Sequence, residues 1–298
     1  MRPLRIVVGF AAGGGLDTLT RHFGEQMRIA TGLPVIVDNR PGASGMVAAE
    51  VVSRAPADGM TLLMGDSSLL VAHHFLSRKV PHPLNGFTPV AGISRMPLLL
   101  VAHPKIGTTG VQEFLDLLMA SPGQLSCGSP GIGTIHHLAF ELLKHRSGCF
   151  SVHIPYRGAS QLIPDLANGL IQLAVVSATA GMPHVKSGRI KAIALMSSDT
   201  MPATSGVSLL SDALPGFDAA PRQMLLAPSG TPTDIVESIS ETVRKLMSGP
   251  GQTIRMQDLG ISPAYLSAGP LANALEQESN AWSDIVRVRK LSAQPVTL

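Results

Sequence analysis

Short apolar runs alternate with amphipathic helical segments along nearly the whole of this 298-residue chain. The alternation predicts strands at 4–10, 34–38, 60–65, 88–102, 124–128, 151–155, 171–176, 191–196 and 222–228. It predicts helices at 16–31, 45–54, 111–120, 134–147, 159–169, 233–248 and 269–290. Such a pattern is typical of mainly parallel sheets covered by helices. The expected fold class is therefore α/β.

One predicted strand is too long for a single core strand. The run at 88–102 is interrupted by Gly92 and Pro97, so we expect it to pass from one sheet into another, with 220–228 as the return crossing. A ligand would then bind where the carboxyl ends of both sets of strands face a cleft. The expected division is into a discontinuous lobe and an inserted lobe: 1–101 with 224–298, and 102–223.

Composition excludes several classes of partner. The net charge of +3 is scattered along the chain, and aromatic residues make up only 4%, so a nucleic-acid partner is not expected. No apolar run approaches the roughly 20 residues of a membrane span. Residues 1–3 lead straight into the first strand without a signal peptide, which fits a cytosolic protein or a mature secreted form. Cys127 and Cys149 could pair or remain buried thiols.

The first predicted strand ends in a glycine loop. Residues 5–17, RIVVGFAAGGGLD, pass from a β-branched run through Gly13, Gly14 and Gly15 to a helix near Asp17. Backbone N–H groups at such a helix start bind anions, with the positive end of the helix dipole behind them. Glycine is expected because a Cβ would block the backbone conformation and the approach of a ligand. The alternative interpretation is a tight turn without a ligand.

Three further loops of small polar residues follow predicted strands, at 65–68, 128–134 and 156–160. Each could be a simple turn, but two of the four loops would lie in each lobe and face one cleft. A partly buried helix N-terminus contributes up to about 2 kcal/mol to anion binding, and charge-assisted hydrogen bonds add about 1.5–3 kcal/mol each. The pattern therefore favours micromolar binding of a small anion with two ends, near about −8 kcal/mol.

An enzyme is the leading alternative. Residues 65–69, GDSSL, are similar to the start of a serine esterase motif, with Ser67 as the nucleophile. Such an esterase needs a histidine base near its C-terminus, whereas the last histidine here is His184. The chain also contains no G-x-S-x-G nucleophile elbow. We therefore predict no catalytic residue.

Cofactor and metal motifs are incomplete. Gly131 and Gly133 lack the third glycine of a dinucleotide fingerprint, because His136 occupies its place, and there is no Walker lysine. The histidine pairs at 73–74 and 136–137 are adjacent residues, which point about 100° apart on a helix. Neither pair can chelate a metal as an i, i+4 pair would. No cofactor and no metal are predicted.

The same loops carry a family resemblance that covers about residues 3–290. The chain resembles the Bug-type solute receptors of bacterial tripartite tricarboxylate transporters in these blocks: VVGFAAGGGLDTLTR, LPVIVDNRPGASGMVAAEVVSRAPADGMTLLMG, GSPGIGTIHHLAFELLK, IPYRGASQLIPDLANG, MPHVKSGRIKAIAL and LAPSGTP. The resemblance implies a type II periplasmic-binding-protein fold with two lobes that close on a carboxylate. It implies ligand-binding residues at Phe10, Ala12, Gly13, Gly14, Asp17, Ser67 and Ser68, and at Gly131, Thr134, Ile135, Tyr156 and Gly158.

The chain departs from the family pattern at three places. Val176 and Ser177 stand where many relatives have an Asp-Asn pair, which argues against an amino-acid ligand and leaves Ser177 as a candidate contact. Ile135 replaces a small hydroxyl residue. Arg222 stands where an aromatic residue is common, and it could contact a carboxylate in the cleft or lie in solvent at a strand edge.

The resemblance implies a non-enzymatic periplasmic receptor, with its signal peptide outside this sequence. The expected ligand is a small organic acid, either a di- or tricarboxylate or an aromatic acid. The expected partners are the membrane subunits of the transporter, and a monomer is expected. A receptor that presents its ligand to a signalling partner is the second alternative.

Overall fold

The computed structural model describes residues 2–75, 83–108, 110–198 and 200–291. The strands are β1 Leu4–Val8, β2 Val35–Asn39, β3 Thr61–Asp66, β4 Phe87–Arg95, β5 Leu98–Ala102, β6 Ser126–Ser129, β7 Val152–Pro155, β8 Leu173–Ser177, β9 Lys191–Leu195, β10 Arg222–Pro228 and β11 Ser262–Ser267. The α-helices are α1 Gly15–Thr31, α2 Met46–Ser53, α3 Leu69–Ala72, α4 Val111–Ala120, α5 Ile135–Ser147, α6 Ala159–Ala167, α7 Ala178–Lys186, α8 Thr233–Met247, α9 Gln252–Asp258 and α10 Ala268–Val288.

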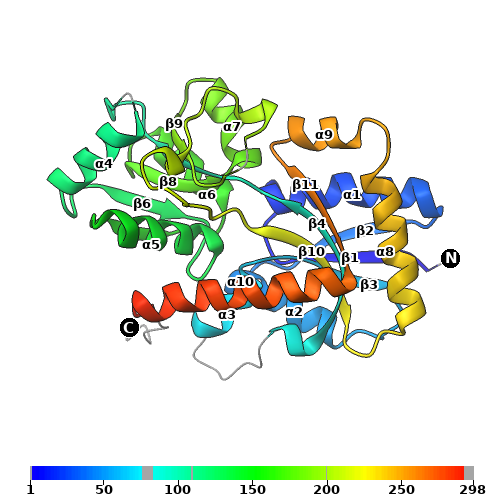
Figure 1. The fold of residues 1–298 in the computed structure, drawn as a ribbon. Helices are drawn as coiled ribbons and strands as arrows, with labels where there is room; N and C mark the ends of the chain where they lie inside the picture. The colour runs from blue at the N-terminus through cyan, green and yellow to red at the C-terminus, as the bar shows by residue number, and fades with distance from the viewer. Residues whose placement is uncertain (1, 76–82, 109, 199, 292–298) are drawn as a thin grey trace.

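These elements form two lobes, each built on one sheet (Figure 1). The first lobe has the strand order β11-β4-β10-β3-β1-β2, and the second has β7-β6-β8-β5-β9. Leu19, Phe23 and Met27, predicted as the apolar face of the first helix, are buried as expected. The α/β fold class is confirmed.

The expectation of mainly parallel sheets needs correction, because both sheets are mixed. Strand β1 pairs parallel with β2 and β3, and β6 pairs parallel with β7 and β8. The remaining pairs, which involve β4, β5, β9, β10 and β11, are antiparallel. The physical reason is the double crossing: β4 leads out of the first lobe and β10 leads back in, so these neighbours run in opposite directions.

The crossing itself occurs at Pro97. This residue divides the predicted strand 88–102 into β4, in the first sheet, and β5, in the second. The Met96 amide donates to the Pro221 carbonyl at 3.0 Å, so the two crossing segments lie side by side. Residues 98–101, which we expected in the first lobe, pair within the second sheet. We propose that the lobes meet at Pro97 and Pro221.

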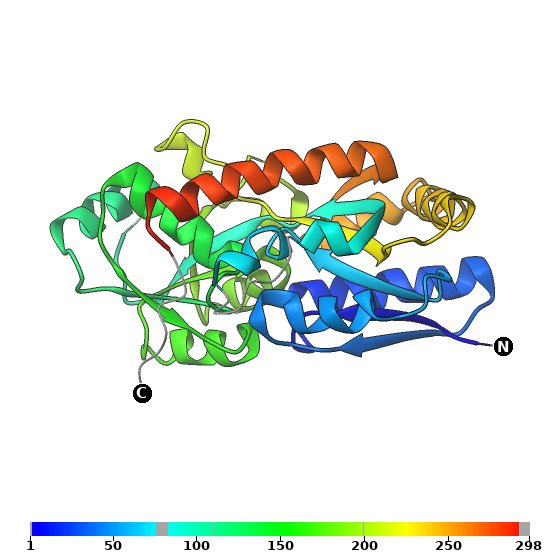
Figure 2. The same cartoon turned by 90° about the horizontal axis from the view of Figure 1, so that it is seen from below.

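Helix α10 runs along both lobes in two perpendicular views (Figures 1 and 2). It contacts α3 of the first lobe and α5 of the second. Beyond its end, Arg289 Nε donates to Glu141 Oε2 of α5 at 3.1 Å. Among the residues that the structure describes, no helix is both long and apolar enough to cross a membrane.

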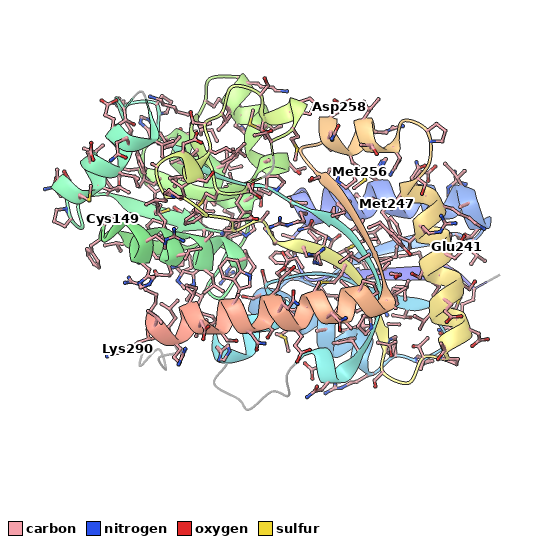
Figure 3. The ribbon with its side chains drawn as sticks, in the orientation of Figure 1. Cys149, Glu241, Met247, Met256, Asp258 and Lys290 are labelled. Carbon is pink, nitrogen blue, oxygen red and sulfur yellow. The ribbon has the colours of Figure 1, made fainter. Side chains whose placement is uncertain are left out.

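Four elements were not predicted: α3, α7, α9 and β11. Helix α7 contains both Gly181 and Pro183, which oppose helix formation. Its buried residues Ala178 and Met182 stabilise the helix through packing. Met247 of α8 and Met256 of α9 are both buried in the first-lobe core (Figure 3). Cys127 and Cys149 are both buried free thiols.

Candidate functional site

A cavity lies between the two lobes, with about 590 Å³ of empty space, open solvent included. The first lobe and the crossing segments line it with Phe10, Ala11, Ala12, Gly14, Gly15, Leu16, Asp66, Met96, Pro221 and Gln223. The second lobe lines it with Pro130, His136, Gly158, Ala159, Ser160 and Ser177. Five of the predicted site residues are thus brought together here: Phe10, Ala12, Gly14, Gly158 and Ser177.

Three helices begin at this cavity. Their N-cap residues, Gly14 of α1, Gly158 of α6 and Ser177 of α7, all line it. The first amides of a helix have no acceptor within the helix. At α7 the Ala178 amide donates to the Pro97 carbonyl and the Ala180 amide to the Ser177 hydroxyl, so the first amides of α1 and α6 are the ones we expect a ligand to contact. The positive ends of three helix dipoles therefore meet at one volume, which favours an anion there.

The glycine loop before α1 is held by an internal contact. The Gly13 amide donates to Asp17 Oδ2 at 2.9 Å, and Asp17 Oδ1 accepts from Asn39 at 2.9 Å. Burial raises the pKa of Asp17, but hydrogen bonds from Arg21, Gly13 and Asn39 outweigh it and leave the pKa below its ordinary value. Gly13 and Asp17 do not line the cavity. They shape the loop that presents Gly14, and their predicted ligand contacts stay predictions.

The glycines of this loop have different reasons to be glycine. Gly13 has a φ of 82°, which favours glycine, whereas Gly14 has a φ of −80°, open to any residue. A Cβ on Gly15 would lie 2.5 Å from Ser177 Oγ and 2.7 Å from Met96 Sδ. The first turn of α1 therefore packs directly against the second lobe.

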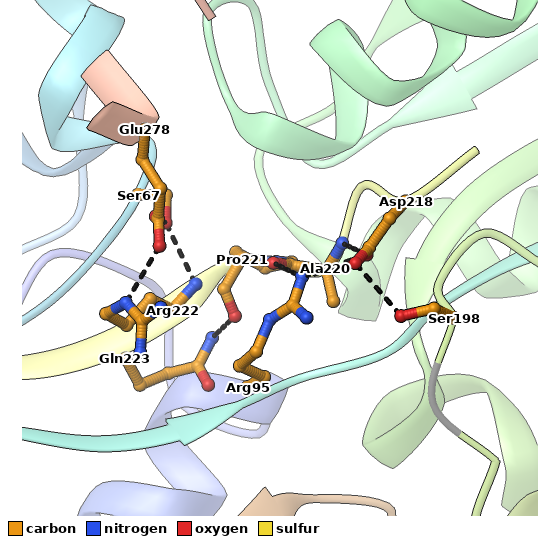
Figure 4. Close-up of polar contacts among 9 residues, drawn as sticks. All are labelled: Ser67, Arg95, Ser198, Asp218, Ala220, Pro221, Arg222, Gln223 and Glu278. Carbon is orange, nitrogen blue, oxygen red and sulfur yellow. Dashed lines mark hydrogen bonds and ion pairs between the residues drawn. The ribbon is translucent and has the colours of Figure 1, made fainter. Parts of the chain in front are cut away.

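Two neighbouring strands present alternate residues to opposite faces. Asp66 of β3 and Gln223 of β10 are partners in register, and both line the cavity. Side chains one position away point to the other face of a sheet. Accordingly, Arg222 Nε pairs with Glu278 of α10 at 2.8 Å, and the Ser67 hydroxyl donates to Glu278 at 2.7 Å (Figure 4). Ser67 and Arg222 thus do not line the cavity in this arrangement, and their predicted ligand contacts stay predictions.

The start of α5 is tied to the other lobe. The Ile135 amide donates to the Ser68 hydroxyl at 3.0 Å, so this amide already has an acceptor in this arrangement. Ser68 and Ile135 thus form a contact between the lobes, and their predicted contacts with the ligand stay predictions. A second such contact runs from the Ser44 hydroxyl to the Ile132 carbonyl at 2.5 Å. The lobes thus touch around the cavity.

Three more predicted residues line a groove beside the cavity instead of the cavity itself: Gly131, Thr134 and Tyr156. Thr134 caps α5 by accepting from the His137 amide at 3.3 Å. The Tyr156 hydroxyl donates to Asp165 at 3.0 Å. Burial and this carboxylate raise the pKa of Tyr156 to about 12.

This geometry can be compared with known proteins. Over residues 19–291 the chain matches the family described as "Tripartite tricarboxylate transporter family receptor". The chain belongs to this family. A Pseudomonas protein in the tcbD-tcbE intergenic region is 31% identical over 98% of this chain and 88% of its own.

Solved structures of similar receptors share the fold. An R. palustris protein with adipate has a TM-score of 0.93 at 28% identity, with 98% of each chain covered. The periplasmic binding protein BugD has a TM-score of 0.89 at 25% identity, covering 98% of this chain and 99% of its own. The predicted Bug-type receptor with a two-lobed binding-protein fold is confirmed.

Sequence reasoning missed two titratable residues of this receptor's cavity. Burial raises the pKa of Asp66 to about 6, although hydrogen bonds with Ser68 oppose the shift. Burial also lowers the pKa of His136 to about 4. Both residues lie in segments that the sequence analysis quoted, GDSSL and GIGTIHH. The available signal for Asp66 was its place at the carboxyl end of an apolar strand.

We expect the Asp66 carboxyl to cost stability at neutral pH. Its pKa rises from 3.8 to about 6 on folding. The folded protein therefore gains stability from binding a proton at Asp66 below about pH 4, and this gain is lost as the pH rises through about 6. A shift of about two units corresponds to about 3 kcal/mol. Asp66→Asn should therefore raise the urea midpoint at about pH 7.5 and leave it unchanged near about pH 4. Asp116→Asn, exposed on α4, is the control; equal behaviour of both variants would contradict the prediction.

Proposed function

We propose that this receptor binds a small organic carboxylate in the cavity between its lobes and delivers it to the membrane subunits of a tripartite tricarboxylate transporter. The observation that carries the proposal is the meeting of the α1, α6 and α7 N-termini at one cavity. Backbone amides of residues that line it, Gly15, Leu16, Ala159 and Ser160, would hold the carboxylate without a cationic side chain. The adipate bound to the R. palustris relative supports this ligand class.

Release would require the lobes to separate. The contacts from Ser68 to Ile135 and from Ser44 to Ile132 run from one lobe to the other, so both would break when the lobes separate. Such hinge closure around a ligand is a common arrangement in binding proteins. We propose that the membrane subunits recognise the closed form and open it.

We further propose that the receptor catalyses no reaction, acts as a monomer and works in the periplasm. Ser67 is fully buried, and its hydroxyl contacts Glu278 and the Arg222 amide instead of the cavity. This placement supports the proposal that Ser67 is not a nucleophile for a ligand in the cavity. The periplasmic location is supported by BugD, a periplasmic binding protein.

Binding should be visible as thermal stabilisation. A ligand that binds only the folded state at one hundred times its Kd adds about 2.7 kcal/mol, which raises the Tm by several degrees for a chain of this size. We expect at least one acid in a panel of dicarboxylates, tricarboxylates and aromatic acids to do so, and the matching primary amides to have no effect. A panel in which no acid raises the Tm would overturn the proposed function.

A further inference from the structure

A buried histidine of the second lobe lies beneath an aromatic side chain of the first. His137 of α5 is only 6% exposed, and the ring of Phe75, just beyond α3, meets it edge-on with the ring centroids 5.8 Å apart. The same phenyl ring covers Gly133, where an added Cβ would lie 2.8 Å from Phe75 Cδ2. Its neighbour His74 instead contacts Ser283 of α10 at 3.2 Å. Because Phe75 belongs to the other lobe, separation of the lobes would uncover the His137 ring.

The ring of His137 is used in its neutral form. The Gly133 amide donates to Nδ1 at 3.2 Å, so this nitrogen carries no proton here. A protonated imidazole donates from both nitrogens and accepts at neither, so a proton on His137 would break this hydrogen bond. The loop that the bond holds, residues 130–134, also supplies the Ile132 carbonyl that accepts from Ser44 of the first lobe. The neutral ring therefore supports a contact between the lobes.

The groups around His137 oppose a positive charge on its ring. Burial and the nearby Lys144 ammonium lower the pKa of His137 to about 4. The ring of His153 in β7 stacks on it with the centroids 4.1 Å apart, and burial and His137 lower the pKa of His153 to about 3. Glu141 Oε1 lies 3.8 Å from His137 Nε2, but this carboxylate already pairs with Lys144 and Arg289. The covered ring is therefore neutral at pH 7.

We propose that ligand binding to this receptor releases a proton from His137, so that acid favours the open form and the release of the bound carboxylate. The inference rests on the proposed function, because closure of the lobes around a ligand is what brings Phe75 over the ring. The proton leaves to water when the ring is covered and returns from water when the ring is uncovered. His137 thereby couples the cavity to the pH of the surroundings, although it does not line the cavity itself.

Two pKa values of His137 set the pH range of this effect. In the open form the ring is more exposed to water, and its pKa moves toward the ordinary value of 6.5. In the closed form burial and Lys144 hold the pKa of His137 at about 4. The open form therefore binds more protons between about pH 6.5 and about pH 4, and acid shifts the equilibrium toward it in this range. The full difference would weaken binding up to about thirtyfold at about pH 5.

Calorimetric titration in two buffers of different ionisation enthalpy measures the protons released on binding. The probe is adipate at about pH 5.5, or the acid of the thermal-shift panel that raises the Tm most if adipate does not bind. The wild-type receptor should release at least about 0.3 proton per ligand more than His137→Asn. Asparagine keeps an acceptor for the Gly133 amide but does not titrate. The carboxyl groups of the free acid titrate equally in both experiments, so their contribution cancels in the difference.

Two further variants separate this coupling from a structural role. Phe75→Ala removes the cover of the ring, so its proton release should match that of His137→Asn. His145→Asn changes an exposed histidine of the same helix and should release as many protons as the wild type. Circular dichroism checks the folding of each variant, and Phe75→Ala with His145→Asn decides the matter if His137→Asn does not fold.

The outcomes separate the two proposals. Equal proton release by the wild type, His137→Asn and Phe75→Ala overturns the inference and leaves the proposed function intact. The same holds if His137→Asn weakens binding by one factor at about pH 7.5 and at about pH 5, since a purely structural role has no such pH dependence. If no acid of the panel binds, the proposed function itself fails, and the inference fails with it.

Discussion

Gly14→Val should abolish carboxylate binding while the protein stays folded. The φ of −80° at Gly14 is open to valine, and a Cβ there would meet only the Ala11 carbonyl, at 3.5 Å. The valine side chain would instead occupy the cavity that Gly14 lines. Loss of two charge-assisted hydrogen bonds, at about 1.5–3 kcal/mol each, corresponds to more than about a hundredfold in Kd. Calorimetry with the acid that gives the largest thermal shift measures it.

A matched control comes from the second lobe. Gly110 is the N-cap of α4, has an extended φ of −149°, and would place a Cβ in open space. Gly110→Val therefore also replaces an N-cap glycine with valine, but at a position that does not line the cavity. This variant should keep its affinity for the acid. Unchanged affinity in Gly14→Val would show that the α1 start does not hold the ligand.

The sequence predicted the cavity's outline better than its contacts. Glycine loops after apolar strands correctly located Gly14 and Gly158, because both the chain direction and the need for small residues are local properties. Which side chains face inward depends on pairing between β3 and β10, where Asp66 lies opposite Gln223. A shift of one residue moves a side chain to the opposite face of a sheet. Asp66 therefore lines the cavity, whereas its neighbour Ser67 does not.

Contacts between lobes were beyond sequence reasoning for a related reason. The partner of the Ile135 amide is the Ser68 hydroxyl, and only the closed position of one lobe on the other brings them together. The two crossings, by contrast, could be predicted from strand length and from Pro97 alone. Helix α7 was missed because Gly181 and Pro183 oppose local helix preference, so its stability comes from tertiary packing.

Glu141→Ala should destabilise the second lobe strongly. Glu141 of α5 has a side chain 4% exposed, and it forms an ion pair with Lys144, which is 7% exposed. It also accepts from Arg289 beyond α10 at 3.1 Å, so it links α5 to the end of the helix that spans both lobes. Removing one partner of a buried pair leaves an uncompensated charge, which costs about 3–5 kcal/mol. Urea unfolding followed by circular dichroism measures the loss.

Glu241→Ala in α8 is the matched control for this prediction (Figure 3). Glu241 pairs with Arg244 at the same i, i+3 spacing, at 2.6 Å, but both side chains are about half exposed. Water screens such a pair, so its removal should leave the urea midpoint nearly unchanged. The double variant Glu141→Leu with Lys144→Met should recover much of the lost stability, because it removes both buried charges. Equal losses in Glu141→Ala and Glu241→Ala would mean that burial of the Glu141–Lys144 pair contributes nothing.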